Sequence, residues 1–178
     1  VFAPTNDYFS EAQANAQIAI YDQDKKKGRK EKENRAIKEF VMNHIALYNH
    51  STPETAAYND TIVMMNGKYL ALTNNTIGEQ SFDSQQPHAN GILYTVDGQL
   101  DYLPNVLEQL EKVDDLSKLA KFFDSYNDYK FIPEQSVAGD IKNGQTVYLD
   151  SVTRLQNILF DYVGDINNED STYWMIVP

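Results

Sequence analysis

The sequence predicts an α+β protein, with helices and strands in separate stretches of the chain. Three observations predict this fold class. Apolar residues recur at helical spacing over residues 5–43, short apolar runs with Asn-Gly turns fill residues 61–97, and helical spacing returns after residue 104. The last change of pattern also predicts a boundary, so we expect one region over residues 1–104 and a second over residues 105–178.

The first residues predict the end of a strand followed by a capped helix. Phe2 lies in an apolar run that Pro4 closes, and the Thr5 hydroxyl, with Asn6 beside it, can accept a hydrogen bond from a free helix N–H. The helix is therefore expected from Thr5 to about Tyr21. Its apolar face would carry Phe9, Ala12, Ala16 and Ile20.

A charged segment separates this helix from the next. Residues 24–33 are expected to form an exposed loop, and the alternative, a polyanion-binding patch, is weakened by acids among the lysines. A second amphipathic helix is expected from Glu31 to about Asn43, before alternation over residues 44–48 predicts a strand. The apolar face of this helix would carry Ile37, Phe40, Val41 and His44.

The middle of the chain is expected to be β-structure. Asn66-Gly67 and Asn90-Gly91 are turn signals, and Asn-Gly is the strongest short-range indication of a hairpin. In the strand after the second turn, Ile92, Tyr94 and Val96 alternate, as core-facing residues do. Strands are expected at residues 61–65, 69–73, 76–82 and 92–97, with one short helical turn at residues 52–58.

The second region begins with apolar residues at helical spacing, which Asp114-Asp115 should divide into two helices. Asn143-Gly144 marks a turn. Residues 151–160 fit either a strand or a helix. Strands are expected at residues 131–137, 146–149 and 171–177, with a polar loop at residues 165–170.

The two ends of the chain share a pattern. Val1–Pro4 aligns with Met175–Pro178 at a constant offset, since each is an apolar run closed by proline. The match predicts one period of a tandem array, cut at the same point of successive copies.

The overall composition limits the classes of function. The chain has 178 residues, room for one good core or two small ones. Its net charge of −11 makes nucleic acid an unfavourable partner. The absence of cysteine excludes disulfides, thiolate metal sites and cysteine nucleophiles. No apolar run is long enough to span a bilayer, so we expect no transmembrane segment in this stretch.

Three segments carry a resemblance to a known family. Val1–Phe9 is similar to a signature in which a strand runs through F-A-P-T-N into a helix. Asn43-His44-Ile45 lies where a Tyr-His motif follows an amphipathic helix, and Asn90–Asp97, leading to Leu103-Pro104, is similar to N-G-V-I-H-V-I-D leading to L-P. By these segments, in this order, the chain resembles the fasciclin-like domain family. It departs from the pattern at Asn43, where the family has tyrosine, and at Tyr94, where the family has histidine.

The resemblance implies a fasciclin-like wedge β-sandwich with several packed helices. Residues 1–104 would be one such domain without its N-terminal helices. Residues 105–178 would be the N-terminal part of a following domain, or would complete a single permuted unit; cleavage near residues 104–116 into two stable pieces would favour the former. The fold signature would be carried by Phe2, Pro4, Thr5, Asn6, Asn90, Gly91 and Asp97.

The resemblance also implies a function. The chain is similar to multi-domain fasciclin-like lipoproteins of the outer envelope of gut bacteria, whose work is adhesion without chemistry of their own. It implies an extracellular module at the cell surface, lipid-anchored to the bacterial outer membrane. The partners would be a surface protein or polysaccharide and the adjacent fasciclin-like domains of the same chain.

Aromatic residues supply the candidate contacts. Twelve tyrosines and one tryptophan are many for this length, and such rings bind sugar faces or anchor protein interfaces. Tyr126 and Tyr129 are expected to be exposed among polar neighbours. A glycan-binding module and a purely structural spacer are therefore alternatives. The candidate interaction residues are His44, Ile45, Tyr48, Tyr126 and Tyr129.

Signals for catalysis are weak. The sequence has no G-x-S-x-G nucleophile turn, no glycine-rich phosphate loop and no zinc-type histidine spacing, so we expect no catalytic residue, no metal and no cofactor. Acids cluster over residues 97–115, where a carboxylate pair of a glycosidase is the alternative to a solvated acidic face. His44 is expected to be a buried, hydrogen-bonded histidine rather than a catalyst.

Overall fold

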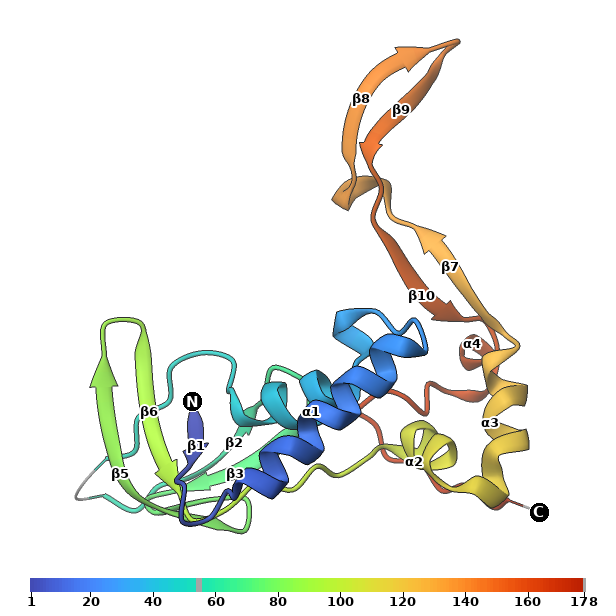
Figure 1. The fold of residues 1–178 in the computed structure, drawn as a ribbon. Helices are drawn as coiled ribbons and strands as arrows, with labels where there is room; N and C mark the ends of the chain where they lie inside the picture. Colours follow the sequence, from blue (N-terminus) through green and yellow to red (C-terminus); the bar gives the residue numbers. More distant parts are fainter. Residues whose placement is uncertain (54–55, 178) are drawn as a thin grey trace. The chain divides into compact units, whose positions relative to one another are not determined.

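A computed structural model describes residues 1–53 and 56–177 and divides the chain into two compact units, Val1–Leu103 and Pro104–Pro178 (Figure 1). Helices make up 30% and strands 31% of the chain, which confirms the α+β fold class. Each unit has its own apolar core.

The first unit is built on a mixed six-stranded sheet with the strand order β1-β6-β5-β4-β3-β2. Strand β1 pairs with β6 in parallel, Phe2 opposite Tyr94 and Pro4 opposite Val96, whereas all other neighbours are antiparallel. The strands are β1 (Phe2–Pro4), β2 (Asn59–Val63), β3 (Tyr69–Thr73), β4 (Thr76–Ile77), β5 (Gln80–His88) and β6 (Gly91–Val96).

One core lies on this sheet, and each of the six strands contributes a side chain to it. The ring of Tyr94 stacks on Phe2 at 4.8 Å between centroids and meets the edge of Phe82, also at 4.8 Å. Tyr94 and Val96 are buried and Ile92 packs against them, so the predicted alternation of β6 is confirmed. The buried core residues are Phe2, Ile62, Met64, Leu72, Ile77, Phe82, Tyr94, Val96 and Leu100.

Both predicted hairpins of the first unit are present. Gly67 adopts a φ of +86°, which closes the turn between β2 and β3. Gly91 opens β6, which pairs with β5. The expected strand over residues 76–82 is instead two strands, β4 and the start of β5, with a turn at Gly78. The helical turn expected over residues 52–58 includes residues 54 and 55, outside the described part of the chain.

The first helix is displaced from the predicted position. Helix α1 (Glu11–Lys26) is capped by Ser10, whose hydroxyl accepts from the N–H of Gln13 at 3.3 Å. The Gln13 side chain accepts in return from the Ser10 N–H at 2.9 Å. This reciprocal pair satisfies two donors, which a lone threonine cannot do, so the predicted cap at Thr5 is wrong. The Thr5 carbonyl accepts from two N–H groups of a preceding turn.

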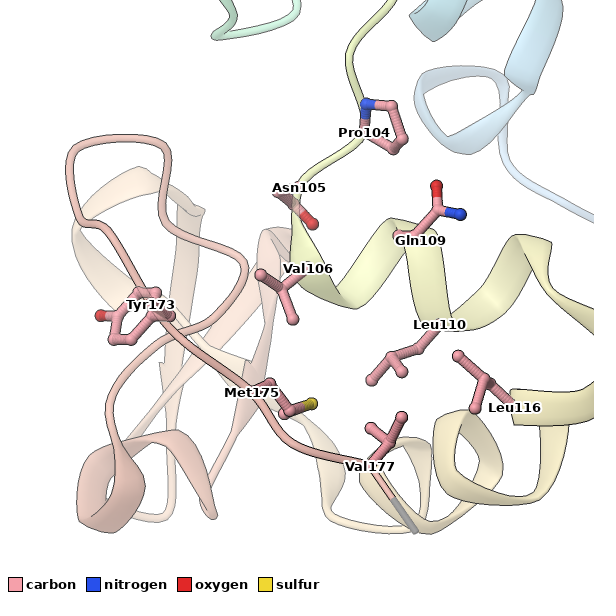
Figure 2. A pocket seen from close by; sticks show the side chains of 9 residues that line it. All are labelled: Pro104, Asn105, Val106, Gln109, Leu110, Leu116, Tyr173, Met175 and Val177. Carbon is pink, nitrogen blue, oxygen red and sulfur yellow. The ribbon is translucent and has the colours of Figure 1, made fainter.

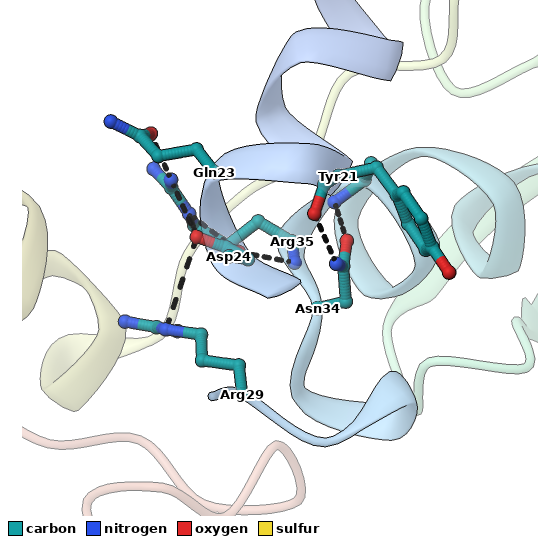
Figure 3. Close-up of polar contacts among 7 residues, drawn as sticks. Tyr21, Gln23, Asp24, Arg29, Asn34 and Arg35 are labelled. Atoms are coloured by element: carbon teal, nitrogen blue, oxygen red, sulfur yellow. Dashed lines mark hydrogen bonds and ion pairs between the residues drawn. The ribbon is translucent and has the colours of Figure 1, made fainter. Parts of the chain in front are cut away.

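The charged segment after residue 24 is not uniformly exposed. Asp24 is fully buried near the end of α1, and its carboxylate accepts from the backbone N–H of Arg35 at 2.9 Å and from Nη2 of Arg35 at 2.8 Å (Figure 3). Asn34 donates beside it to the Tyr21 carbonyl at 3.0 Å. The expected exposed loop is therefore wrong at Asp24, because an acid can be buried when a cation and an N–H satisfy it.

The predicted second helix is broken into three short pieces. The side-chain oxygen of Asn34 accepts from the N–H of Ala36 at 3.1 Å, which separates the first piece from the next. The strand expected over residues 44–48 is wrong: Ala46 alone bridges to Met64, and Tyr48 has a φ of +65°, which turns the chain out of a strand. The pieces are η1 (Glu31–Glu33), the π-helix η2 (Ala36–Val41) and η3 (Met42–His44).

The second unit begins with two helices, divided at Asp114-Asp115 as predicted. Asn105 and Glu108 form a capping box at the start of α2. The core of the second unit consists of Leu110, Ala120, Phe123 and Ile166. The helical elements are α2 (Val106–Lys112), η4 (Asp114–Leu116), α3 (Ser117–Asp124), η5 (Pro133–Gln135) and α4 (Phe160–Val163).

Two predicted strands of this unit are wrong. The strand over residues 131–137 is interrupted because Pro133, which has no N–H for a ladder, starts a 3₁₀ turn. Residues 172–177 form no regular element; Tyr173, Met175 and Val177 instead pack on the core of the unit. The two chain ends with similar sequences therefore differ among the described residues: Phe2–Pro4 pair with β6, whereas residues 175–177 pair with no strand. Pro178 lies outside the described residues.

Candidate interaction surface

The second unit carries a β-arm, residues 127–157, made of two consecutive ribbons that lead away from α3 and α4 (Figure 1). The inner ribbon pairs β7 (Asn127–Phe131) with β10 (Thr153–Asn157), and the outer ribbon pairs β8 (Val137–Lys142) with β9 (Gln145–Asp150). The predicted turn at Asn143-Gly144 forms the tip of the outer ribbon, with positive φ at both residues. Such a two-residue turn matches the twist of the paired strands.

The base of the arm is fixed by Asn157. Its side chain, only 8% exposed, donates to the carbonyl of Phe123 at 2.8 Å and to the side chain of Asn127 at 2.8 Å. Its oxygen accepts from the N–H of Leu159 at 3.0 Å. One amide therefore ties both strands of the inner ribbon to the end of α3 and the start of α4.

The two ribbons are joined by Ser136. Its hydroxyl donates to the Ile132 carbonyl at 2.8 Å and accepts from the Val152 N–H at 2.9 Å. The rings of Phe131 and Tyr148 meet edge to face at 4.7 Å across the same joint. The outer ribbon therefore continues the inner one through defined contacts.

The arm exposes apolar side chains. Ile141 and Leu149 of the outer ribbon are 74% and 78% exposed. An isolated two-stranded ribbon is marginally stable in water, and each strand of the outer ribbon has one paired neighbour among the described residues. The arm therefore offers both free strand edges and apolar side chains to a partner. Further exposed apolar residues on it are Tyr129, Phe131, Val137, Val147 and Leu155.

Two of the residues predicted from the sequence lie at this arm. Tyr129 is on β7 opposite Leu155 and is 51% exposed. The expected exposure of Tyr126 is wrong: it is half-buried just before β7, because its ring packs edge to face on Phe122 at 5.3 Å. Sequence reasoning missed Ser136 and Asn157, because a single polar residue in a strand pattern carries no local signal. The one available indication of a joint between the two ribbons was Pro133, since proline interrupts a strand.

The other predicted residues lie in the first unit and differ in accessibility. His44 is 6% exposed; it contacts the carbonyl of Phe40 through Nδ1 at 2.7 Å and the N–H of Leu100 through Nε2 at 3.0 Å. Burial lowers the pKa of His44, an effect that the Phe40 hydrogen bond only partly offsets. The expectation of a buried, hydrogen-bonded histidine is confirmed. Ile45 is half-buried, and Tyr48 is 86% exposed.

Asn43, where the resembled family has tyrosine, is fully buried beside His44. Its amide donates to the carbonyls of Leu100 and Asp101 at 3.3 and 3.1 Å, and its oxygen accepts from Asn66 at 2.9 Å. Both residues of this motif thus hold the chain after β6 in place. Sequence reasoning gave Asn43 no such role, since its partners are distant in the chain.

A pocket of about 410 Å³ lies in the second unit between α2 and the C-terminal segment (Figure 2). Met175 and Val177 line it together with Leu110 of α2, and no acid is among its lining residues. The Glu108 carboxylate, which belongs to the predicted acidic cluster, instead accepts from the Asn105 N–H at 3.0 Å. In the part of the chain that the structure describes, no three or more His, Asp or Glu side chains are grouped to hold a metal ion.

No described helix combines the length and apolar character needed to cross a membrane. Comparisons of the chain with protein-family models, with curated proteins and with solved structures found no match.

Proposed function

We propose that the chain is a non-enzymatic adhesion or interaction module of a bacterial cell surface, and that the β-arm is its contact surface. The observation that carries the proposal is the exposure of apolar side chains along the two-ribbon arm, Ile141 and Leu149 above all. Exposed aliphatic and aromatic groups on a fixed scaffold are typical of protein-binding surfaces. The extracellular, lipid-anchored location and the tandem array with adjacent fasciclin-like domains belong to the same proposal, through the resemblance.

Two features support recognition through binding rather than chemistry. Three buried polar side chains of the first unit, Asp24, Asn43 and His44, are occupied by contacts within the unit. The anchored base of the arm lets it present side chains in a fixed orientation, which reduces the ordering cost of binding.

The proposal is tested by shortening the arm. Replacing residues 133–151 with Asn-Gly leaves Ile132 and Val152, already joined by a 2.9 Å hydrogen bond, on either side of a two-residue turn. Beads coated with the full chain should bind bacterial outer-envelope fragments, and beads coated with the shortened chain should lose most of this binding. Equal binding of both, or no binding by the full chain, would contradict the proposal. Circular dichroism checks that the helices remain.

A second candidate function is glycan binding, favoured by the exposed Tyr129 ring beside Leu155 on the inner ribbon. Tyrosine rings stack on the apolar faces of sugars. Retardation of the chain in polysaccharide-containing gels should then decrease with Tyr129→Ala and Tyr126→Ala. Tyr8→Ala, at a tyrosine of the first unit that is 53% exposed and is not a candidate residue, is the matched control. Absence of retardation on every polysaccharide tested counts against this candidate.

A further inference from the structure

The free edge of β8 has a self-complementary pattern centred on Ile141. Asp140 precedes Ile141 and Lys142 follows it, and all three side chains are exposed. The register of β8 against β9 shifts between Ala138 and Ile141, whereas Ile141 and Lys142 pair in sequence with Thr146 and Gln145. Over residues 140–142 the alternation of a strand would place Asp140 and Lys142 on one face and Ile141 on the other. Among the described side chains, neither Asp140 nor Lys142 forms an ion pair.

The turn at the tip decides which backbone groups face this edge. Asn143 and Gly144 form a two-residue turn with φ values of +52° and +76°, and Lys142 lies opposite Gln145. In such a hairpin the residues flanking the turn bond to each other, so the next residue directs its N–H and C=O away from the partner strand. The backbone N–H and C=O of Ile141 are thus directed to the free edge of β8.

We propose that two copies of the chain associate through their β8 edges, in an antiparallel pair centred on Ile141. The two Ile141 residues would exchange both backbone hydrogen bonds, as directly opposed residues do in antiparallel pairs. Asp140 of each copy would lie opposite Lys142 of the other, so one two-fold axis generates two ion pairs. The pairing turns two marginal ribbons into one four-stranded sheet, β9-β8-β8-β9.

A second copy fits this edge better than an unrelated strand does. The charge order Asp-Ile-Lys is complementary to itself only in the antiparallel direction. A parallel pair in the same register would place Asp140 against Asp140 and Lys142 against Lys142, which is unfavourable. The inference deepens the proposed function by naming one partner of the arm, and it relies on that proposal only in treating the arm as a contact surface.

The experiment is a charge exchange, read by sedimentation equilibrium of the full chain over a range of concentrations. Asp140→Lys and Lys142→Asp each turn two attractive pairs into two repulsive ones, and each should weaken the dimer about tenfold or more. The double variant restores complementary pairs and should dimerise like the original chain. An equimolar mixture of the two single variants should form heterodimers, because each supplies the charges that the other needs.

Two controls test whether the effect is local and whether it involves the backbone. Asp7→Lys and Lys118→Asp make the same charge changes at exposed positions outside the arm, and should leave the dimer unchanged. Ile141→Pro removes the outward N–H, so dimerisation should be lost while the hairpin remains, since an edge strand tolerates proline at an outward position.

A monomer at about millimolar concentration overturns the inference, as does a dimer that both single variants retain or a mixture without heterodimers. These results are separable from those of the envelope-binding test. A chain that dimerises but does not bind envelope fragments supports this inference and contradicts the proposed function. A monomeric chain that binds envelope fragments through the arm supports the proposed function and contradicts this inference.

Discussion

The Nε2 atom of His44 accepts a 3.0 Å hydrogen bond from the backbone N–H of Leu100, which joins segments 56 residues apart. Because Nε2 accepts, the neutral ring carries its proton on Nδ1 and donates it to the Phe40 carbonyl at 2.7 Å. A second proton would place two N–H groups against each other in a buried site. The folded first unit therefore requires a neutral imidazole.

This requirement predicts a pH dependence of stability. Burial lowers the pKa of His44 below its ordinary value of 6.5, so around and below that pH the unfolded chain binds a proton that the folded chain does not. The stabilisation is complete above pH 6.5 and should be lost as the pH falls toward the lower, folded pKa. Urea unfolding at about pH 7.5 and about pH 5.5 measures it. His44→Gln should reduce the slope, whereas His88→Gln, at an exposed position, should not.

The buried pair of Asp24 and Arg35 gives a second prediction. Asp24→Asn removes the charge that Arg35 neutralises, and the free energy of unfolding should fall by about 2 to 4 kcal/mol, since Arg35 stays partly hydrated. Asp22→Asn, an exposed position on the same helix, should change it little. Because hydrogen bonds from Arg35 lower the pKa of Asp24, its contribution is present above the ordinary value of 3.8 and lost on acidification below it. Equal unfolding midpoints of the two variants in urea would contradict this role.

The hydroxyl of Tyr94 is a third test. It donates to the carbonyl of His50 at 2.7 Å in a partly buried position, while the ring stacks on Phe2 in the core. Tyr94→Phe keeps the ring and removes the donor, and should cost about 1 to 2 kcal/mol of unfolding free energy. Tyr48→Phe removes an exposed hydroxyl and should be neutral. If both variants unfold like the original chain in urea, the hydroxyl contributes nothing to stability.

The fourth prediction concerns the anchor of the arm. Asn157→Leu keeps a similar volume but loses all three hydrogen bonds of the side chain, and should destabilise the second unit by about 2 to 3 kcal/mol. Hydrogen exchange should accelerate in β7 and β10 more than in the strands of the first unit. Gln156→Leu is the control: it changes the residue next to Asn157 and removes only one hydrogen bond, to Asp161 at 3.2 Å. Unchanged exchange in β7 would show that the arm is held by other contacts.

Local signals predicted much of the fold. The Asn66-Gly67 and Asn143-Gly144 turns and the alternation of Tyr94 and Val96 depend on neighbouring residues only, so the sequence pattern was sufficient for them. The start of α1 was mistaken because Thr5 and Ser10 both suit a cap, and the choice depends on Gln13 three residues after Ser10.

Features that depend on distant partners were not predicted. Asp24 is buried because Arg35 reaches it from a separate element, and nothing beside it in the sequence indicates this. The same holds for the candidate surface. The exposure of Tyr129 was predicted from its polar neighbours, but the arm that carries it was not, since its base and joint depend on Asn157 and Ser136.

The parallel pairing of β1 with β6 has a consequence for biosynthesis. Phe2 emerges from the ribosome well before Tyr94, its partner in both the ladder and the core. At roughly 5 to 20 residues per second, β1 waits about 5 to 20 seconds for its site to be translated. The pairing of β1 with β6 therefore completes the sheet last during co-translational folding, and until then the apolar strand β1 is available to chaperones.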